Sequence, residues 1–94
     1  MLNLEDAFNK FENEWMNFDH IESPPSHRPE LCALMLLDRL VPGSGGVLDM
    51  TMNHEIEICI DMERFAAVAT EDDILTLTRC GVCYDADRGT LVWI

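Results

Sequence analysis

Proline and glycine residues divide this chain into short segments, and the division limits the elements that it can form. Three prolines fall within residues 22–29, a Pro-Gly pair opens a glycine-rich stretch at 42–46, and single glycines stand at positions 81 and 89. Both residue types interrupt regular helices and strands. The longest run of consecutive apolar residues, Leu31–Leu37, is far shorter than the ~20 residues that a membrane-spanning helix needs. We therefore expect a fold of short helices and strands.

The length of 94 residues corresponds to a single domain, residues 1–94, with a thin core. A chain of this size buries only about 60–65% of the surface that its unfolded form exposes. Apolar residues make up 48% of the chain, which is typical of a globular fold and too high for a disordered one. We therefore expect the chain to fold without a metal ion.

The first segment, residues 3–18, has the periodicity of one amphipathic helix. Its large apolar residues recur at spacings of four and three, which places them on one face. Asn3 can cap the start, and Glu5 and Asp6 stand in the first turn, where the helix dipole favours negative charge. We expect this face to pack on the core, and the alternative is a dimer or partner surface. The residues of the face are Leu4, Phe8, Phe11, Trp15 and Phe18.

A second helix is predicted over residues 29–41, after an extended proline-rich connector at 22–29. Pro29 suits the first turn of a helix, and Pro42 with Gly43 ends it. Because its apolar residues leave almost no polar face, we expect this helix to be central and buried.

Alternation predicts a strand over residues 54–61, where isoleucines stand at every second position. Residues 47–53 fit either a strand or a short turn of helix. Asp61 can cap a helix at 62–69, and Thr70 with Asp73 forms a capping-box pattern for a helix at 71–80. Gly81 is then well placed as the residue after the helix end.

A hairpin is predicted at the end of the sequence, with strands at 82–85 and 90–94 around the loop 86–89. Gly89 supplies the left-handed residue that a short hairpin loop requires. The resulting order of elements is typical of an α+β fold. We expect a small, mostly antiparallel sheet of about three strands, packed with three to four helices that cover one face.

The charge balance is strongly acidic. Eighteen Asp and Glu residues face six Lys and Arg, which gives a formal net charge of −12. This charge repels nucleic acid phosphates and anionic lipid headgroups, so direct binding to nucleic acid or to a membrane surface is not expected. A basic protein partner is favoured instead, because opposite potentials speed encounter and fix orientation. The alternative is that the charge only keeps the protein in solution.

The cysteines indicate a reducing compartment. The first eighteen residues include Glu5, Asp6, Lys10, Glu12 and Glu14, so they lack the apolar region of a secretory signal. All four cysteines, at positions 32, 59, 80 and 83, lie in apolar stretches rather than in cysteine-dense loops. We therefore expect free thiols and a cytoplasmic protein.

Cys80-Gly-Val-Cys83 is the one short motif with possible metal or redox chemistry. A redox pair needs a thiolate stabilised by a helix N-terminus, whereas this motif follows a predicted helix C-terminus. A zinc module or small metal-dependent enzyme would use Cys80, Cys83 and His54, but no second pair of ligands has metal spacing. We favour small buried hydrophobes, with no metal and no cofactor.

No catalytic set is visible in the sequence, so we do not expect an enzyme. Glu55 and Glu57 project from one strand face roughly 7 Å apart, which would suit an acid/base pair. A solvated strand face explains them better. No Ser/His/Asp or Cys/His arrangement can be assembled without assuming a fold.

The acidic residues form two clusters along the chain. If they lie on one side, the protein presents a band of carboxylates that can occupy a groove built for a nucleic acid backbone. For each carboxylate alone, a helix cap or solvated surface charge is the simpler explanation. The residues of the predicted band are Glu5, Asp6, Glu12, Glu14, Glu55, Glu57, Glu63, Glu71, Asp72 and Asp73.

These features lead to three hypotheses. The first is a protein-binding inhibitor that imitates nucleic acid charge on a basic target. In size, charge and the lack of a catalytic set the chain is similar, as a type, to the small acidic inhibitors made by phages and mobile elements, which implies anti-CRISPR or anti-restriction activity. The second is a structural or regulatory adaptor that dimerises through Phe8, Phe11, Trp15 and Phe18, and the sequence itself leaves open whether the protein is a monomer or a homodimer. The third is the zinc-binding module.

Overall fold

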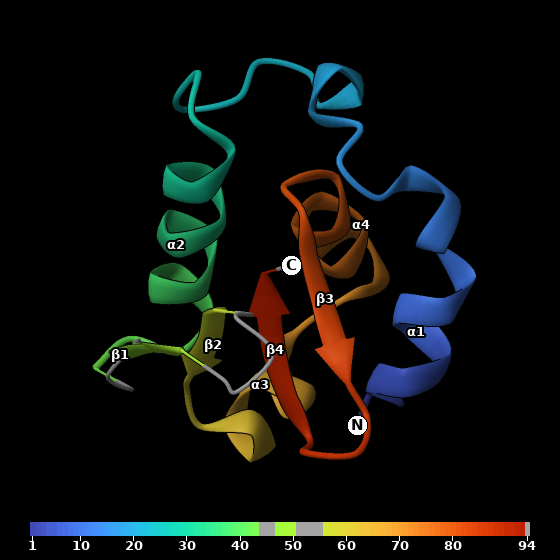
Figure 1. Cartoon of the computed structure of the whole chain (residues 1–94), viewed down its shortest axis with the longest axis vertical. Helices are drawn as coiled ribbons and strands as arrows, with labels where there is room; N and C mark the ends of the chain where they lie inside the picture. The colour runs from blue at the N-terminus through green and yellow to red at the C-terminus, as the bar shows by residue number, and fades with distance from the viewer. Residues whose placement is uncertain (44–46, 51–55, 94) are drawn as a thin grey trace.

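The computed structural model describes residues 1–43, 47–50 and 56–93, with the backbone alone described for 47–50. The predicted α+β class is confirmed, and Figure 1 shows how the elements are arranged. In chain order the elements are α1 (Leu4–Lys10), η1 (Glu12–Glu14), η2 (Phe18–His20), α2 (Pro29–Leu40), β1 (Val47–Met50), β2 (Ile56–Cys59), α3 (Met62–Val68), α4 (Glu71–Arg79), β3 (Val82–Asp85) and β4 (Thr90–Trp93), where η marks a short 3-10 helix.

The sheet is antiparallel throughout the described strands and has the order β1-β2-β4-β3. It contains one strand more than expected, because the ambiguous stretch at 47–50 pairs with β2. The predicted hairpin is confirmed in β3 and β4, and Gly89 has a φ of 68°. The last strand, β4, therefore lies inside the sheet, between β2 and β3.

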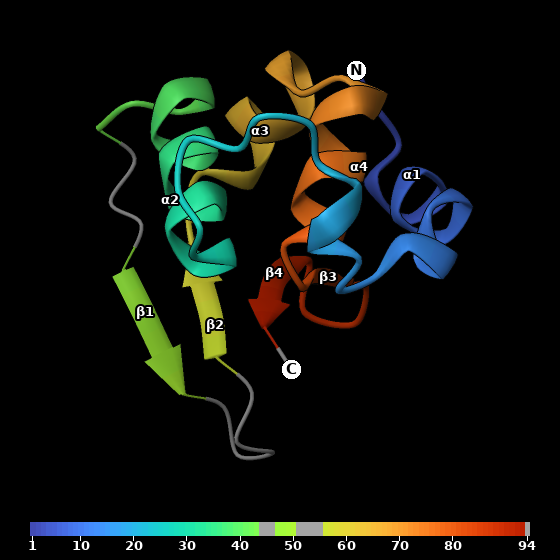
Figure 2. The ribbon, with the colours of Figure 1, turned by 90° about the horizontal axis from the view of Figure 1, so that it is seen from above.

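The α-helices of the described residues, α1 to α4, lie on one side of the sheet, as Figure 2 shows. The core forms between these two layers. Register pairs Ile58 of β2 with Leu91 of β4, so both side chains point to the same face. Both are fully buried, and so is Phe65 of α3. The largest fully buried side chains are Phe65, Ile58, Ile74, Leu77, Leu91 and Val82.

Helices α3 and α4 begin where the capping residues predict. Asp61 Oδ1 accepts a hydrogen bond from the Arg64 amide at 3.1 Å. Thr70 Oγ1 accepts from the Asp73 amide at 3.2 Å, and Asp73 Oδ2 accepts from the Thr70 amide at 2.9 Å. This reciprocal pair satisfies amides that a helix start leaves without partners. The predicted role of Gly81 is also confirmed, because it follows the end of α4 with a φ of 94°.

The predicted single helix over residues 3–18 is wrong. Asn3 caps the start as expected, since its Oδ1 accepts from the Asp6 amide at 3.1 Å. However, α1 ends at Lys10, and two short 3-10 helices follow it. Met16 takes a positive φ of 65°, which a continuing α-helix does not allow.

The helix breaks because residues 11–20, which we call the η segment, bend toward the C-terminal end of α4. The Met16 amide donates to Thr78 O at 3.1 Å, and Trp15 Nε1 donates to Gly81 O at 3.2 Å. These two donors are satisfied by carbonyls at the end of α4 and just after it, and Thr78 O also accepts from the Gly81 amide at 3.0 Å. A straight helix over 3–18 would carry Trp15 and Met16 past these carbonyls.

Helix α2 has nearly the predicted bounds but is not buried all round. Leu31 is 44% exposed and Met35 is 51% exposed. Only one side of α2 packs inward, with Cys32, Ala33, Leu36 and Leu37 buried. Residues 21–28, before it, carry no helix or strand. No helix within the described part of the chain is both long and apolar enough to span a membrane.

Candidate protein-binding surface

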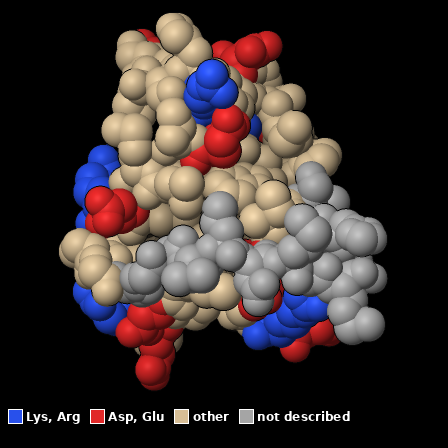
Figure 3. Space-filling view, turned by 60° about the vertical axis from the view of Figure 1, so that its left-hand side comes forward, with Lys and Arg blue, Asp and Glu red and all other residues tan. Residues whose placement is uncertain are grey.

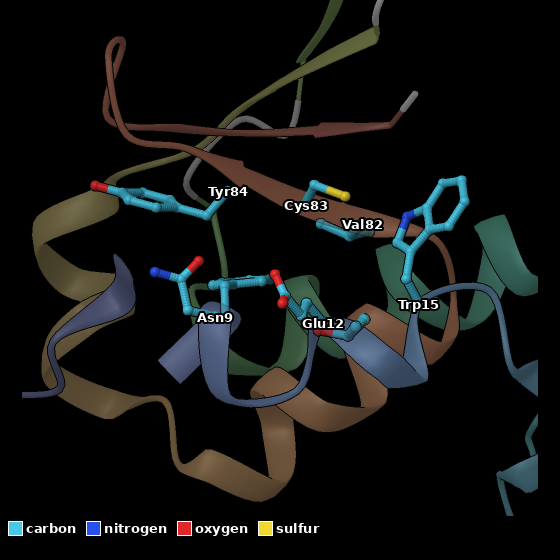
Figure 4. A pocket seen from close by; sticks show the side chains of 8 residues that line it. Asn9, Glu12, Trp15, Val82, Cys83 and Tyr84 are labelled. Atoms are coloured by element: carbon cyan, nitrogen blue, oxygen red, sulfur yellow. The ribbon is translucent and has the colours of Figure 1, made fainter. Parts of the chain in front are cut away.

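A cavity of about 290 Å³ opens between α1 and β3. One wall comes from α1 and η1, and the other from the end of α4 and from β3, as Figure 4 shows. Asn9 and Glu12 project from the first wall toward β3, while Trp15 and Tyr84 stand at opposite ends. The fold brings these two walls together, since their residues lie more than sixty positions apart in the chain.

The aromatic rings around this cavity are held by contacts within the chain. Phe8 and Tyr84 stack with their ring centroids 5.9 Å apart and their planes 20° from parallel. The bond from Trp15 Nε1 to Gly81 O fixes the indole, which nevertheless remains 39% exposed. The cavity is therefore preformed, and a ligand would not have to order these rings.

Polar groups at the cavity are open to solvent. Asn9 and Glu12 are exposed, and within the described part of the chain no cation pairs with the Glu12 carboxylate. The nearest base in sequence, Lys10, is engaged elsewhere. Its Nζ lies 2.6 Å from Glu71 Oε2 and 5.4 Å from the centroid of the Phe11 ring.

A second cavity, of about 370 Å³, lies between α2 and α4. Its lining is largely apolar and includes Ile21, Met35 and Leu36. The two charged residues that line it, Arg39 and Asp73, already face each other, with Arg39 Nη2 3.7 Å from Asp73 Oδ1. Among its described lining residues the carboxylate, that of Asp73, therefore has a cation beside it, whereas Glu12 at the first cavity has none.

The predicted acidic residues divide into two structural groups, and Glu55 lies outside the described residues together with His54. The first group points into solvent from the starts of helices or from η1. It consists of Glu5, Asp6, Glu12, Glu63, Glu71 and Asp72. The second group consists of Glu14, Glu57 and Asp73, which are half-buried and each lie beside an arginine.

Glu14 shows how this second group is used. Its Oε2 lies 2.7 Å from His20 Nδ1 and 3.3 Å from Arg79 Nε. The hydrogen bond with His20, followed by that with Arg79, holds the pKa of this carboxyl below its usual value of 4.5. The carboxylate therefore joins the η segment to α4 rather than facing a partner. Glu57 lies 3.8 Å from Arg88 in a similar way.

One face of the molecule, seen in Figure 3, carries carboxylates and basic groups side by side. Its red groups are scattered over a mostly uncharged surface, and several adjoin blue ones. Among the described residues, this face holds no continuous band of carboxylates. That the carboxylates converge elsewhere in one band stays a prediction.

The aromatic residues of the predicted face do not share one surface. Phe8 is buried, and Phe11 and Phe18 are partly buried against the core. Trp15 alone of these four is exposed, and it belongs to the cavity between α1 and β3. The face was predicted from one continuous helix, so the break after Lys10 separates its members.

The cysteines match the prediction only in part. Cys80 is buried, and this burial, with a smaller effect of the Cys32 thiol, raises its pKa to about 12. A thiol in this state is a poor nucleophile and metal ligand. Cys83 is half-buried rather than buried and lines the cavity between α1 and β3. The described residues contain no group of three or more His, Cys, Asp or Glu that could hold a metal ion.

Sequence reasoning missed Asn9, Thr78, Val82 and Tyr84 as parts of a cavity. Glu12 and Trp15 were singled out for charge and for aromatic character, but not as neighbours of β3. A signal existed in the exposed Asn9 and Glu12 at a spacing of three, which places them on one side of a helical turn. The opposite wall had no comparable signal.

No protein-family model matches this chain, and neither a curated protein nor a solved structure matches it.

Proposed function

We propose that this protein binds the basic surface of a nucleic-acid-handling protein and inhibits it by imitating phosphate charge. The charge balance carries the proposal. Six Lys and Arg residues face eighteen Asp and Glu, so twelve negative charges of this chain have no positive charge of Lys or Arg to balance them. A surface of this kind attracts the basic grooves that proteins build for nucleic acid backbones.

The arrangement of the exposed carboxylates supports the proposal. Glu5, Asp6 and Glu63 stand in the first turns of α1 and α3, and Asp72 stands in the first turn of α4. These residues are exposed, so their charges face solvent without the contacts that bind Glu14 or Asp73. A partner that neutralises them gains attraction and breaks none of the ion pairs within this fold.

The biological form that we propose is anti-defence activity, against a CRISPR effector or a restriction enzyme. Such targets hold nucleic acid in positively charged channels, which a compact acidic protein can occupy. In this role the protein needs neither a cofactor nor catalysis. The chain acts by excluding the nucleic acid.

The test begins with capture of partners from host lysate at low and at high salt, with mass spectrometry of the retained proteins. A captured protein is then titrated with the chain and with its own nucleic acid. We expect the affinity for the chain to fall as salt rises, and we expect nucleic acid and chain to compete for one site. Salt-independent affinity, or simultaneous binding of both ligands, would contradict the proposal.

Charge-neutral variants locate the surface within the same experiment. Glu5→Gln with Asp6→Asn removes two exposed carboxylates from α1, whereas Glu63→Gln removes one from α3. We expect at least one of these variants to bind the partner more weakly at low salt while its melting curve stays cooperative. Equal binding by all variants at every salt concentration argues against charge mimicry by these residues.

A further inference from the structure

The cavity between α1 and β3 combines aromatic surfaces with an acceptor that lacks a cation. Trp15 presents an exposed ring whose N–H is already used by Gly81 O, so the open part of the ring is its π surface. Tyr84 stands at the other end, backed by Phe8. Glu12 lies between them on the α1 side. A planar or aliphatic cation fits these surfaces better than a neutral polar group does.

The chain's own cations leave this acceptor open. Lys10, two residues before Glu12, reaches Glu71 instead, with 2.6 Å between Nζ and Oε2. Arg79 follows Thr78, which lines the cavity, but its Nε lies 3.3 Å from Glu14 Oε2. Within the described residues, the Glu12 carboxylate is the one charge at this cavity, and it is negative.

The cavity also has a size that limits its occupant. Its volume of about 290 Å³ is at the lower end of the range for small-molecule pockets. A single extended side chain is therefore a more suitable occupant than a cofactor. The cavity is open to solvent, and its lining residues Asn9, Glu12 and Trp15 are exposed, so a side chain of another protein can enter it.

We propose that this cavity binds one arginine side chain of the basic partner, with the guanidinium stacked on Trp15 and hydrogen-bonded to Glu12. Arginine is chosen over lysine because its planar guanidinium stacks on aromatic rings and donates two parallel hydrogen bonds to one carboxylate. The Asn9 side chain is a further acceptor on the same wall. This inference rests on the proposed function, since it names the contact by which the partner is anchored.

The test uses the full chain and three short peptides that differ at one position. The peptides carry arginine, lysine or citrulline at the centre of an otherwise glycine sequence, and citrulline keeps the shape of arginine without its charge. Binding is followed by ¹H–¹⁵N NMR. We expect the arginine peptide to shift the Trp15 indole N–H and the Cys83 and Tyr84 amides, and the citrulline peptide to leave them in place.

Two variants with the same change of charge separate the cavity from the general field of the protein. Glu12→Gln removes the carboxylate at the cavity, whereas Glu30→Gln removes an exposed carboxylate from the first turn of α2, outside the cavity. We expect Glu12→Gln to weaken arginine-peptide binding about five- to tenfold, as for the loss of one charge-assisted hydrogen bond at an open site. We expect Glu30→Gln to change it less than about twofold.

Several outcomes overturn the inference. These are equal binding by the citrulline peptide, equal weakening by the two variants, shifts confined to residues away from the cavity, and no shifts at all. A lysine peptide that binds as tightly as the arginine peptide overturns the choice of arginine. If a salt-sensitive partner is captured but the arginine peptide does not bind, the proposed function stands and this inference fails. If the arginine peptide binds but no captured protein shows competition between the chain and its nucleic acid, the proposed function fails.

Discussion

In residues 61–81, each helix begins where a side chain close to it in sequence caps it. In the η segment, by contrast, the side chains bond to residues that lie 65 or 66 positions further along the chain. The Asp61 and Thr70 caps span three residues each. The bond of Glu14 instead reaches Arg79, the last residue of α4, and that of Trp15 reaches Gly81 just after it. Both regions satisfy backbone or charged groups that would otherwise lack partners, but only the first does so with neighbours in sequence.

This difference teaches how far hydrophobic periodicity can be trusted. The spacing of Phe8, Phe11 and Trp15 fits one helix, and helix propensity alone gave no reason for a break at Lys10. The carbonyls of Thr78 and Gly81 supplied the reason, because they accept hydrogen bonds from Met16 and Trp15 in the chain after α1. Tertiary contacts therefore outweighed local preference.

The largest expected effect compares one buried aromatic residue from each region. Phe65→Ala in α3 removes a fully buried ring, and we expect it to lower the free energy of unfolding by about 3–5 kcal/mol. Phe11→Ala removes a ring that is only partly buried, so its loss is expected to be smaller. Urea denaturation measures both. Equal losses would mean that the η segment holds the fold together as strongly as the core does.

Gly81 is where the two regions meet, and Gly81→Ala tests that junction. The φ of 94° disfavours a side chain, and an added Cβ would stand 2.7 Å from Met16 Sδ. We expect a loss of about 1–2 kcal/mol, mainly from the backbone conformation, because the flexible Met16 side chain can move aside. The double variant with Met16→Ala should recover only a small part in thermal melts. Full recovery would assign the loss to the steric contact instead.

Thr70→Ala tests whether local capping is as independent as the comparison suggests. The change removes the oxygen that accepts from the Asp73 amide, so we expect a loss of about 1 kcal/mol. Because this cap involves no residue of the η segment, its effect should add to that of Phe11→Ala. Urea denaturation of the single and double variants measures this. A clear departure from additivity would show that the two regions are coupled.

The smallest expected effect is a dependence on pH that belongs to the η segment. Since the pKa of Glu14 is lowered in the folded state, its stabilisation is present above the ordinary value of 4.5 and is lost as the pH falls through the lowered pKa. Glu14→Gln should therefore be less stable than the unmodified protein at neutral pH, and the difference should shrink below pH 4.5.

Glu12→Gln, two residues away, serves as the control for the Glu14 measurement, because within the described residues Glu12 has no cation beside it. Denaturation at a series of pH values gives both profiles. A gap between Glu14→Gln and the unmodified protein that stays constant with pH would contradict the assigned role of Glu14.

The sequence was sufficient for the elements from β2 to β4 and for single residues of the candidate site. Asp61, Thr70 and Gly89 each carry a local signal, so the elements around them could be predicted. Glu12 and Trp15 were also recognised, for their charge and aromatic character. Their meeting with Tyr84 could not be predicted, since it depends on where the break after α1 directs the chain and on how β3 joins the sheet.

The central position of β4 has a consequence for how the protein is made. Residues 90–93 are synthesised after the other described elements, yet among the described strands they are the link between β2 and β3. Until then, β2 and β3 cannot pair with their shared neighbour, and the apolar side chains that face the helices stay open to solvent. A nascent chain that lacks residues 90–93 therefore cannot close this sheet, and such an intermediate is suited to chaperones or proteases.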